Sequence, residues 1–325
     1  MSNERKLMKL LVTGGAGFIG SNYVRNIVSG KLKGVSQITI LDKLTYAGNL
    51  NNLKDLPKDS YEFINGDICD ESQVDLLVAR NDLIVNFAAE THVDRSIQDS
   101  KVFIETNISG VQNLLNAVLS HDSKTFVQIS TDEVYGSIPQ GDATEDFPLE
   151  PNSPYAASKA SADLIVRSFY KTYGLNVKVT RCTNNYGPFQ FPEKIIPLFV
   201  TKLLSGQKVP VYGDGKNIRE WVHVNDHCSG VHLVALFGAP GEVYNIGGGT
   251  ELSNLDLTEK ILRKLNKNNS SIEYVPDRIG HDFRYSICDK KISTKLGYHP
   301  EINFDTGLQS TIEWYVNNIN WWSSL

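Results

Sequence analysis

Two adjacent carboxylates stand where an apolar run in the middle of the chain ends. Residues 126–129 are followed by Ser130, Thr131, Asp132 and Glu133. The run predicts a buried parallel strand, and doubly wound α/β proteins bind ligands beyond the carboxyl ends of their strands. Adjacent residues of an extended strand point to opposite faces, so the chain must bend here for both acids to face one substrate. Two such close carboxyls would split their pKa values, which would keep one of them protonated as an acid beside a base.

A glycine-rich turn near the N-terminus predicts a dinucleotide site. Gly14, Gly17 and Gly20 follow a short apolar strand and open a helical pattern. Glycine lets the backbone turn tightly and approach a pyrophosphate, which then lies on the helix N-terminus. Asp42 ends the next strand, about 20 residues further on, where an acid accepts the ribose hydroxyls of NAD and repels the 2′-phosphate of NADP. NAD is therefore the predicted cofactor, and Asp67, after the third strand, is expected near its adenine.

Tyr155 and Lys159 lie four residues apart in a helical pattern and so share one face. A nearby ammonium, together with a positive nicotinamide ring, would lower the pKa of the phenol from about 10 toward neutrality. Tyr155 is then a candidate base that takes a proton from a hydroxyl while the carbon beneath it loses a hydride.

These residues require a parallel sheet to position them. Apolar strand-like runs alternate with helical patterns along the first half of the chain, which predicts an α/β fold with a doubly wound parallel sheet and helices on both faces. Pro and Gly become frequent after about residue 182. We therefore predict an NAD-binding Rossmann domain over residues 1–182, joined by part of 221–250, and a smaller, mostly C-terminal substrate-binding lobe over 183–325. The segments near 221–236 and 244–246 are expected to return to the sheet.

Composition narrows the classes of function. The 325 residues carry a net charge of −5 with no basic block, so nucleic-acid binding is not indicated. Four scattered cysteines without C-x-x-C spacing suggest neither disulfides nor a zinc site and fit a reducing cytoplasm. No metal-ligand spacing is seen among the histidines. A polar start and the absence of an apolar run of about 20 residues predict neither a signal peptide nor a membrane span.

The chain resembles the extended short-chain dehydrogenase/reductases that modify nucleotide sugars, and among them the dTDP-glucose 4,6-dehydratases almost from end to end. The resemblance is carried by the glycine motif, Tyr155 and Lys159, and by residues 42–49 (DKLTYAGN), 88–97 (AAETHVDRSI), 130–136 (STDEVYG), 151–159 (PNSPYAASK), 180–197 (TRCTNNYGPFQFPEKIIP), 212–227 (YGDGKNIREWVHVNDH) and 247–254. The chain departs from the family pattern at Glu220 and Asn225, where Asp is usual, and at Phe283 and Cys288, where Arg and Asp are expected.

The resemblance implies NAD-dependent loss of water from a dTDP-hexose by oxidation at C4, elimination across C5 and C6, and return of the hydride to C6. It implies Glu133 as the base for the C5 proton, Asp132 as the acid for the 6-hydroxyl, and Thr131 bonding the sugar or the tyrosinate. It also implies a homodimer, with helices beginning near Val102 and Ala156 forming a four-helix interface. The predicted cofactor set, meaning the residues expected to bind NAD, is Gly14, Gly17, Phe18, Ile19, Gly20, Asp42, Lys43, Thr45, Asp67, Ile68, Ala88, Ala89, Tyr155 and Lys159. The substrate set is Asn184, Asn185, Glu193, Lys194, Arg219, Asn254, Arg278 and Tyr285, with the two arginines for the pyrophosphate and Glu193 and Lys194 near the hexose.

Two other functions compete with this one. A UDP-sugar 4-epimerase or C6 decarboxylase of the same superfamily would share the cofactor site, but a 4-epimerase needs only the hydroxyl, the tyrosine and NAD. Elimination needs two further proton transfers, which Asp132 beside Glu133 could supply. A non-catalytic, NAD-dependent binding or regulatory protein would not need Thr131, Tyr155 and Lys159 together with these acids.

Overall fold

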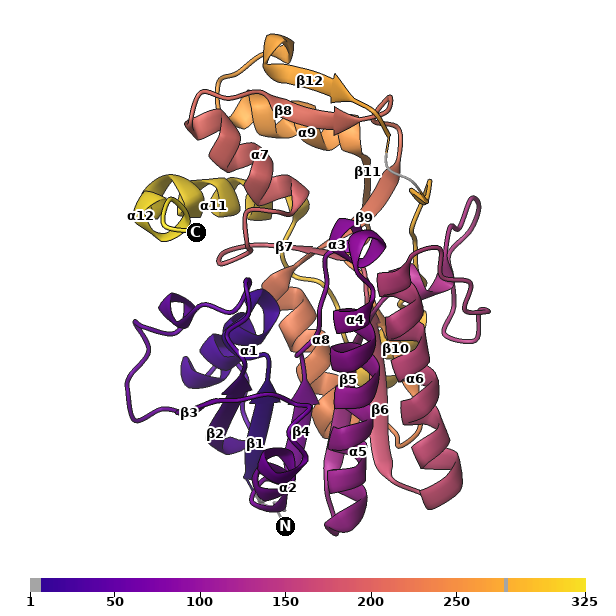
Figure 1. Ribbon diagram of the computed structural model, residues 1–325. Coiled ribbons are helices and arrows are strands. Elements are labelled where there is room, and N and C mark those ends of the chain that lie inside the picture. Colours follow the sequence, from indigo (N-terminus) through magenta and orange to yellow (C-terminus); the bar gives the residue numbers. More distant parts are fainter. Residues whose placement is uncertain (1–6, 278–279) are drawn as a thin grey trace.

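A seven-stranded parallel sheet forms the lower part of the molecule in the computed structural model, which describes residues 7–277 and 280–325 (Figure 1). The strands of this sheet and of two smaller sheets are, in chain order, β1 (Met8–Thr13), β2 (Val35–Asp42), β3 (Glu62–Asn65), β4 (Leu83–Asn86), β5 (Thr125–Thr131), β6 (Asn176–Cys182), β7 (Asn184–Tyr186), β8 (Val209–Tyr212), β9 (Ile218–His223), β10 (Val243–Ile246), β11 (Thr250–Ser253) and β12 (Ile272–Val275). The sheet runs β10-β6-β5-β4-β1-β2-β3, and each neighbouring pair is parallel. The predicted doubly wound α/β fold is confirmed.

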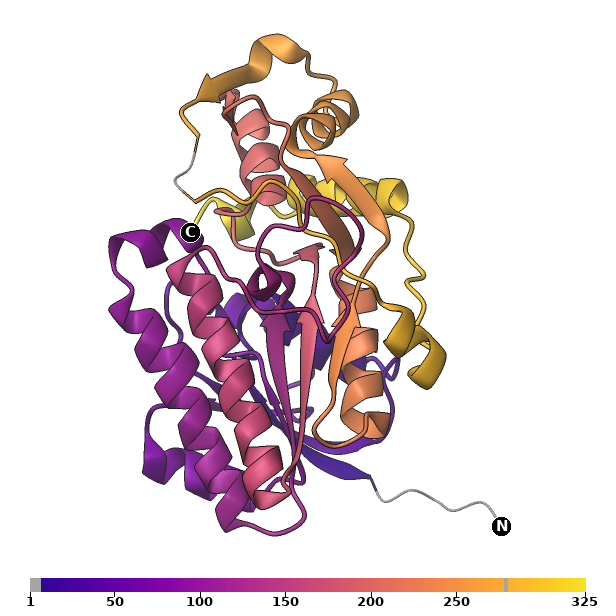
Figure 2. The same cartoon turned by 90° about the vertical axis from the view of Figure 1, so that its right-hand side faces the viewer.

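Helices cover both faces of this sheet (Figure 2). They are α1 (Phe18–Val28), α2 (Glu71–Ala79), α3 (Val93–Gln98), α4 (Lys101–Ile104), α5 (Val111–Ser120), α6 (Pro154–Tyr173), α8 (Val224–Phe237) and α10 (Lys290–Leu296). In β1, Leu10 and Val12 pack into the core shared with α1 and α8, whereas Leu11 packs into the core shared with α2, α5 and α6. Burial on both faces explains why the strands read as continuous apolar runs rather than as alternating ones.

Helix α6 carries the tyrosine–lysine pair, and its ends follow from sequence. Ser153 caps its N-terminus by accepting a hydrogen bond from Ala156 N, and Pro154 occupies the first turn, where its missing N–H costs no bond. Gly174 ends the helix in the left-handed conformation with φ of 71°. The predicted helix over residues 155–173 is therefore confirmed.

The helix predicted over residues 102–119 is confirmed as one continuous helical stretch, and it contains a π-helical segment. It consists of α4, a π-helical segment η2 (Glu105–Gly110), and α5. Within η2, Asn107 accepts from Glu90 N, and its amide donates to Glu90 O and Ser158 Oγ. These bonds tie the helix to the loop after β4 and to α6. Apolar periodicity could not reveal the π-helical segment, because the hydrogen-bond partners of Asn107 are distant in sequence.

The upper part of the molecule in Figure 1 is built mostly from later residues. It holds α7 (Ile195–Leu204), α9 (Asn254–Lys264), α11 (Phe304–Asn317) and α12 (Ile319–Trp322), with a three-stranded sheet β11-β9-β7 and a two-stranded sheet β12-β8. Short 3₁₀ turns complete the described elements: η1 (Leu50–Asn52), η3 (Asp132–Tyr135) and η4 (Asn269–Ser271).

Two later segments were expected to return to the large sheet, and they do so differently. β10 pairs with β6 as an edge strand. The segment near 221–236 does not add a strand: its first residues belong to β9 of the small sheet, and the rest forms α8, which packs on the large sheet. The segment is too long for one strand, and its later part carries the helix that its length favours. The division at residue 182 stays a prediction.

Candidate active site

A cavity of about 600 Å³ lies between the carboxyl ends of the sheet strands and the upper part of the molecule. Every described residue of the predicted catalytic, cofactor and substrate sets lines it. Arg278 lies outside the described residues. The cavity therefore brings together side chains from the loops after β1, β2, β4 and β5, from α6, and from the segment after β6.

The glycine turn shapes one end of the cavity. Gly14 has φ of 70°, and a Cβ there would lie 2.6 Å from Ala88 N, in the loop after β4. A Cβ on Gly20 would lie 2.3 Å from Gly14 O, so the helix could not pack on the turn. Gly17 precedes α1 without a side-chain cap, and a Cβ there would meet only Gly14 O, at 3.3 Å. The turn thus offers an uncapped helix N-terminus to the cavity, which suits a phosphate group.

Asp42 ends β2 beside this turn. Its carboxylate accepts hydrogen bonds from Ala16 N at 2.9 Å and Leu44 N at 2.8 Å, so the acid also holds the glycine turn in place. Burial raises its pKa, although these backbone bonds oppose the shift. Lys43 forms an ion pair with Asp67 at 2.6 Å, which joins two residues of the predicted cofactor set. The residues present therefore fit the adenosine half of a dinucleotide.

The bend required for the acid pair is present at the end of β5. Thr131 is the N-cap of η3, and its hydroxyl accepts a hydrogen bond from Glu133 N at 3.3 Å. The chain thus leaves the strand and turns at once into a 3₁₀ helix that carries Asp132 and Glu133. Both acids line the cavity. The same threonine donates to Asp132 Oδ1 at 3.1 Å.

The pKa of Asp132 is raised well above its ordinary value. Burial is the main cause, and the charges of Glu133 and Glu220 add to it. The other carboxylate oxygen of Asp132, Oδ2, is buried and has no hydrogen-bond partner in the structure. Burial and the neighbouring charges thus favour the protonated form of Asp132, and the catalytic roles of the two acids stay a prediction.

Tyr155 and Lys159 line the same cavity from one face of α6. The expected fall in the pKa of the tyrosine depended on the nicotinamide ring as well as on the ammonium, and it stays a prediction. Burial raises the pKa of Tyr155 well above 10, and the charge of Glu133 adds to this, while a hydrogen bond with Thr131 opposes it. Lys159 donates to Ile129 O at 2.6 Å, and burial lowers its pKa to about 8. Neither the burial of the phenol nor the carbonyl that engages the lysine can be read from a spacing of four residues.

Arg219 and Tyr285 bring the upper part of the molecule to the acid pair. The guanidinium of Arg219 lies 4.3 Å from the centre of the Tyr285 ring and donates to Ile218 O and Asp282 O. Tyr285 donates to Asp282 Oδ2 at 2.6 Å. Burial raises the pKa of Tyr285, and the charge of Glu133 contributes to that shift. The pyrophosphate role of Arg219 stays a prediction.

Asn184 and Asn185 follow β6 and differ in what they offer. The amide of Asn185 is used within the protein, because its Nδ2 donates to Thr183 O and its Oδ1 contacts His227 Nδ1 at 2.9 Å. Asn184 Oδ1 is buried without a hydrogen-bond partner in the structure. Asn184 lines the cavity, and so does Asn254 at the start of α9. Asn184 is therefore better placed than Asn185 to bind a ligand through its side chain.

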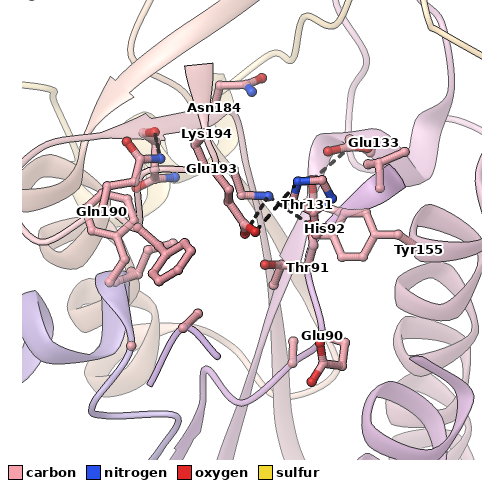
Figure 3. Close-up of a pocket in the computed structure, with 18 of the residues that line it drawn as sticks. Glu90, Thr91, His92, Thr131, Glu133, Tyr155, Asn184, Gln190, Glu193 and Lys194 are labelled. Atoms are coloured by element: carbon pink, nitrogen blue, oxygen red, sulfur yellow. Dashed lines mark hydrogen bonds and ion pairs between the residues drawn. The ribbon is translucent and has the colours of Figure 1, made fainter. Parts of the chain in front are cut away.

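Glu193 is the centre of a polar group that reaches across the cavity (Figure 3). Its Oε1 accepts from the Tyr46 hydroxyl at 3.1 Å, and its Oε2 lies 3.7 Å from His92 Nε2 and 3.8 Å from Arg95. Lys194 donates to Thr91 O at 3.0 Å. Glu193 and Lys194 thus connect the loop before α7 with the loops after β2 and β4.

Several cavity residues were not in the predicted site. Glu90, Thr91 and His92, which follow β4, line the cavity beside the predicted Ala88 and Ala89. Ligands of doubly wound α/β proteins bind beyond the carboxyl ends of the strands, and this rule, applied to β4 as it was to β5, could have identified them. His92 accepts a hydrogen bond from Arg95 N as the cap of α3 and also lines the cavity. Gln190 was missed because its loop shows no periodic pattern of apolar residues that would have placed it near the site.

The departures from the family pattern lie away from the cavity lining. Glu220 is buried and accepts from Gly248 N, Gly249 N and Ile287 N, so the longer acid holds three backbone segments together. Asn225 accepts from Asn26 Nδ2. Phe283 is exposed and Cys288 half-buried, and neither lines the cavity among the described residues. Glu220 nevertheless acts on a reacting group, because its charge helps to raise the pKa of Asp132.

No cluster of three or more His, Cys, Asp or Glu side chains in residues 7–277 and 280–325 could hold a metal ion. Within the same ranges, none of the helices combines the length and the apolar character needed to cross a bilayer.

Comparison with known proteins agrees with this geometry. The family model described as GDP-mannose 4,6 dehydratase matches residues 11–311. A dTDP-glucose 4,6-dehydratase from Streptomyces niveus is 56% identical over 321 residues, covering 98% of this chain and 96% of the relative. The crystal structure of DesIV, a dTDP-glucose 4,6-dehydratase from Streptomyces venezuelae with NAD and TYD bound, superposes with a TM-score of 0.96 at 52% identity, covering 98% of this chain and 99% of that one. A UDP-glucose 4-epimerase from Thermotoga maritima, with UDP-glucose, reaches a TM-score of 0.88 at 28% identity, covering 96% of this chain and 100% of that one.

Proposed function

Because this chain belongs to the dTDP-glucose 4,6-dehydratase family, we propose that it is an NAD-dependent lyase that converts dTDP-glucose to dTDP-4-keto-6-deoxyglucose. The observation that carries the proposal is the acid pair on η3: Asp132 and Glu133 enter the same cavity as Tyr155 and Lys159. A 4-epimerase needs one proton transfer at the sugar hydroxyl, whereas elimination needs a second base and an acid. The identity to dehydratases exceeds that to the epimerase, which supports the same choice.

The chain's own residues divide the proton transfers between them. Tyr155 takes the proton of the 4-hydroxyl, supported by its hydrogen bond with Thr131 and by the ammonium of Lys159. Glu133 takes the C5 proton, which becomes acidic once C4 is a ketone, and a proton exchangeable with solvent returns to C5 when the hydride adds to C6. Asp132 gives its proton to the departing 6-hydroxyl. Burial and the charges of Glu133 and Glu220 raise the pKa of Asp132, which favours the protonated form that this role needs.

The cofactor end of the cavity supports the assignment of NAD. The uncapped N-terminus of α1 suits the pyrophosphate, and Asp42 suits the ribose hydroxyls. When bound, the nicotinamide accepts a hydride from C4 and returns it at C6, so the reaction has no net redox change. The residues that would bind the nucleotide sugar are Asn184, Glu193, Lys194, Arg219, Asn254 and Tyr285, all of which line the other end of the cavity.

The proposal is tested by incubating the purified protein with NAD and with either dTDP-glucose or UDP-glucose. Loss of one water from dTDP-glucose, seen by mass spectrometry, and the absorbance of a 4-keto sugar in alkali are the expected results. An unchanged mass with an altered sugar configuration would identify an epimerase. Loss of carbon dioxide from a UDP-hexuronate, added as a third substrate, would identify a decarboxylase. Unchanged sugars throughout would favour a binding protein.

Asp42→Ala should weaken NAD binding by about tenfold or more, because a hydrogen bond to a charged group contributes about 1.5–3 kcal/mol. Titration calorimetry with NAD measures the change. Asp55→Ala is a suitable control, because it removes an acid paired with Arg25 outside the cavity. Melting temperatures show whether loss of the bonds to Ala16 N and Leu44 N has unfolded the turn. Unchanged NAD affinity would mean that Asp42 serves the turn alone.

We also propose a homodimer in the cytoplasm. Helices α4 and α6 lie side by side and present Val102, Ile104 and Leu164 with exposures of 42%, 50% and 54%, which favours burial against a second copy. Leu164→Glu should convert a dimer of the 36.2 kDa chain into monomers, as measured by light scattering. Phe237→Glu, on α8 at the opposite face of the sheet, should leave the dimer intact. A monomeric parent protein would contradict the proposal.

The cytoplasmic location is supported by the cysteines. The free cysteines Cys69, Cys182, Cys228 and Cys288 fit a reducing compartment.

A further inference from the structure

The turn η3, which carries the acid pair, also carries a buried tyrosine whose hydroxyl is bound on two sides. Tyr135 is 1% exposed and ends η3. Its hydroxyl donates to Asn245 Oδ1 at 2.8 Å and accepts from Arg181 Nη1 at 2.9 Å. The Arg181 guanidinium also lies 4.8 Å from the centre of the Tyr135 ring. Side chains of two strands of the sheet, β6 and β10, thus hydrogen-bond to the end of the turn.

Arg181 continues the connection to the helix of the tyrosine–lysine pair. Its Nε donates to Asp163 Oδ2 at 2.8 Å, and both side chains are almost fully buried. Asp163 lies on α6, where Tyr155, Lys159 and Asp163 follow one another at intervals of four and so share one face. The negative charge of Asp163 acts to raise the pKa of Lys159 against the effect of burial. The same carboxylate therefore faces both Lys159 and the arginine that holds η3.

The turn depends on contacts outside itself for its position. A 3₁₀ helix of four residues has few internal hydrogen bonds, and their geometry is poorer than in an α-helix. At its start Thr131 caps it, and at its end Gly136 turns the chain with φ of 73°, where a Cβ would lie 2.2 Å from Glu150 O. Between these points Val134 packs in an apolar cluster that includes Ala160 of α6, and the Tyr135 hydroxyl bonds η3 to the sheet. A misplacement of about 1 Å at a reacting group can cost about a hundredfold in rate.

We propose that Tyr135 and Arg181 are positioning residues for the elimination half of the reaction. They hold the turn that carries Asp132 and Glu133 at a fixed place relative to the helix that carries Tyr155 and Lys159. This inference rests on the proposed dehydratase function and deepens it. Neither residue lines the cavity among the described residues, so both act through η3.

The test is Tyr135→Phe, compared with Tyr298→Phe. Tyr298 is equally buried, and its hydroxyl donates to Gly247 O at 2.9 Å, away from η3. In Tyr135→Phe, incorporation of solvent deuterium at C5 and formation of the keto product should slow at least about tenfold. Formation of reduced nicotinamide in the first turnover should stay within about threefold of the parent, so that its absorbance builds up. Tyr298→Phe should change neither rate by more than about threefold.

A second measurement does not depend on turnover. Amide hydrogen exchange in a peptide spanning residues 130–136 should be faster in Tyr135→Phe than in the parent and unchanged in Tyr298→Phe. If Tyr135→Phe fails to fold, Arg181→Lys replaces it, because one ammonium cannot bridge Asp163 and Tyr135 as the planar guanidinium does.

Equal slowing of both half-reactions, or exchange no faster than in the control, would overturn the positioning role. A parent protein that does not dehydrate dTDP-glucose would instead overturn the proposed function. In that case the exchange measurement would still decide whether Tyr135 holds the turn.

Discussion

Tyr155→Phe is expected to lower turnover of dTDP-glucose by at least about a hundredfold, the range in which a positioned general base contributes. Phenylalanine keeps the ring, which lies 6.4 Å from that of Phe103 in an edge-on contact, but removes the oxygen that takes the proton of the 4-hydroxyl. Without that transfer C4 is not oxidised, so neither reduced nicotinamide nor keto sugar should form. Stopped-flow absorbance and product analysis measure the two steps in one sample.

Burial raises the pKa of Tyr155 in the chain by itself, so the charges that lower it during catalysis must be strong. The ammonium of Lys159 and the positive nicotinamide ring are the two sources. Tyr173→Phe removes a hydroxyl from the exposed end of the same helix and should leave turnover unchanged. Turnover of Tyr155→Phe within about tenfold of the parent, equal to about 1.4 kcal/mol of barrier, would show that another group takes the proton.

Glu133→Gln is expected to stop the reaction one step later. The amide keeps the shape of the side chain but cannot act as a base near neutral pH, so C5 should keep its hydrogen. Oxidation at C4 depends on Tyr155 and should survive. Reduced nicotinamide and a 4-keto-hexose should therefore build up, while dehydration falls by at least about a hundredfold. Quenched samples analysed by mass spectrometry separate the two sugars.

The same reaction in heavy water gives the discriminating result. The parent enzyme should place solvent deuterium at C5, whereas the hydrogen that arrives at C6 should come from C4 of the same sugar. Glu150→Gln, an exposed acid beyond η3, is the matched control and should behave as the parent does. Normal dehydration with deuterium at C5 in Glu133→Gln would remove Glu133 from the role of base. Solvent deuterium at C6 would exclude return of the same hydride.

The parts of the site that the sequence predicted are those that depend on local geometry. Gly14 and Gly20 are glycines because a Cβ would collide with neighbouring backbone, and a motif of this kind is visible in the sequence alone. Tyr155 and Lys159 share a face because a helix repeats every 3.6 residues. The bend at Thr131 followed from the alternation of a strand, and the side-chain cap that forms it is also local.

The parts that the sequence did not reveal depend on contacts distant in sequence. The pKa of Tyr155 shifts upward because residues from other elements bury it. Asn107, in the π-helical segment of the long helix, bonds to the loop after β4 and to α6. The grip of Arg181 on Tyr135 joins β6 to η3 through side chains 46 positions apart. Each of these follows from packing, which no periodicity records.

The late return of the chain to its first sheet has a consequence for folding. Strand β10 pairs with β6, and α8 covers one face of the sheet, yet both follow β7, α7, β8 and β9 in sequence. During synthesis, the chain up to Cys182 would carry a bare strand edge on β6 and an uncovered apolar face. Such surfaces invite pairing with other chains. Slow ordering of the upper segments would therefore lengthen the interval in which nascent molecules can aggregate.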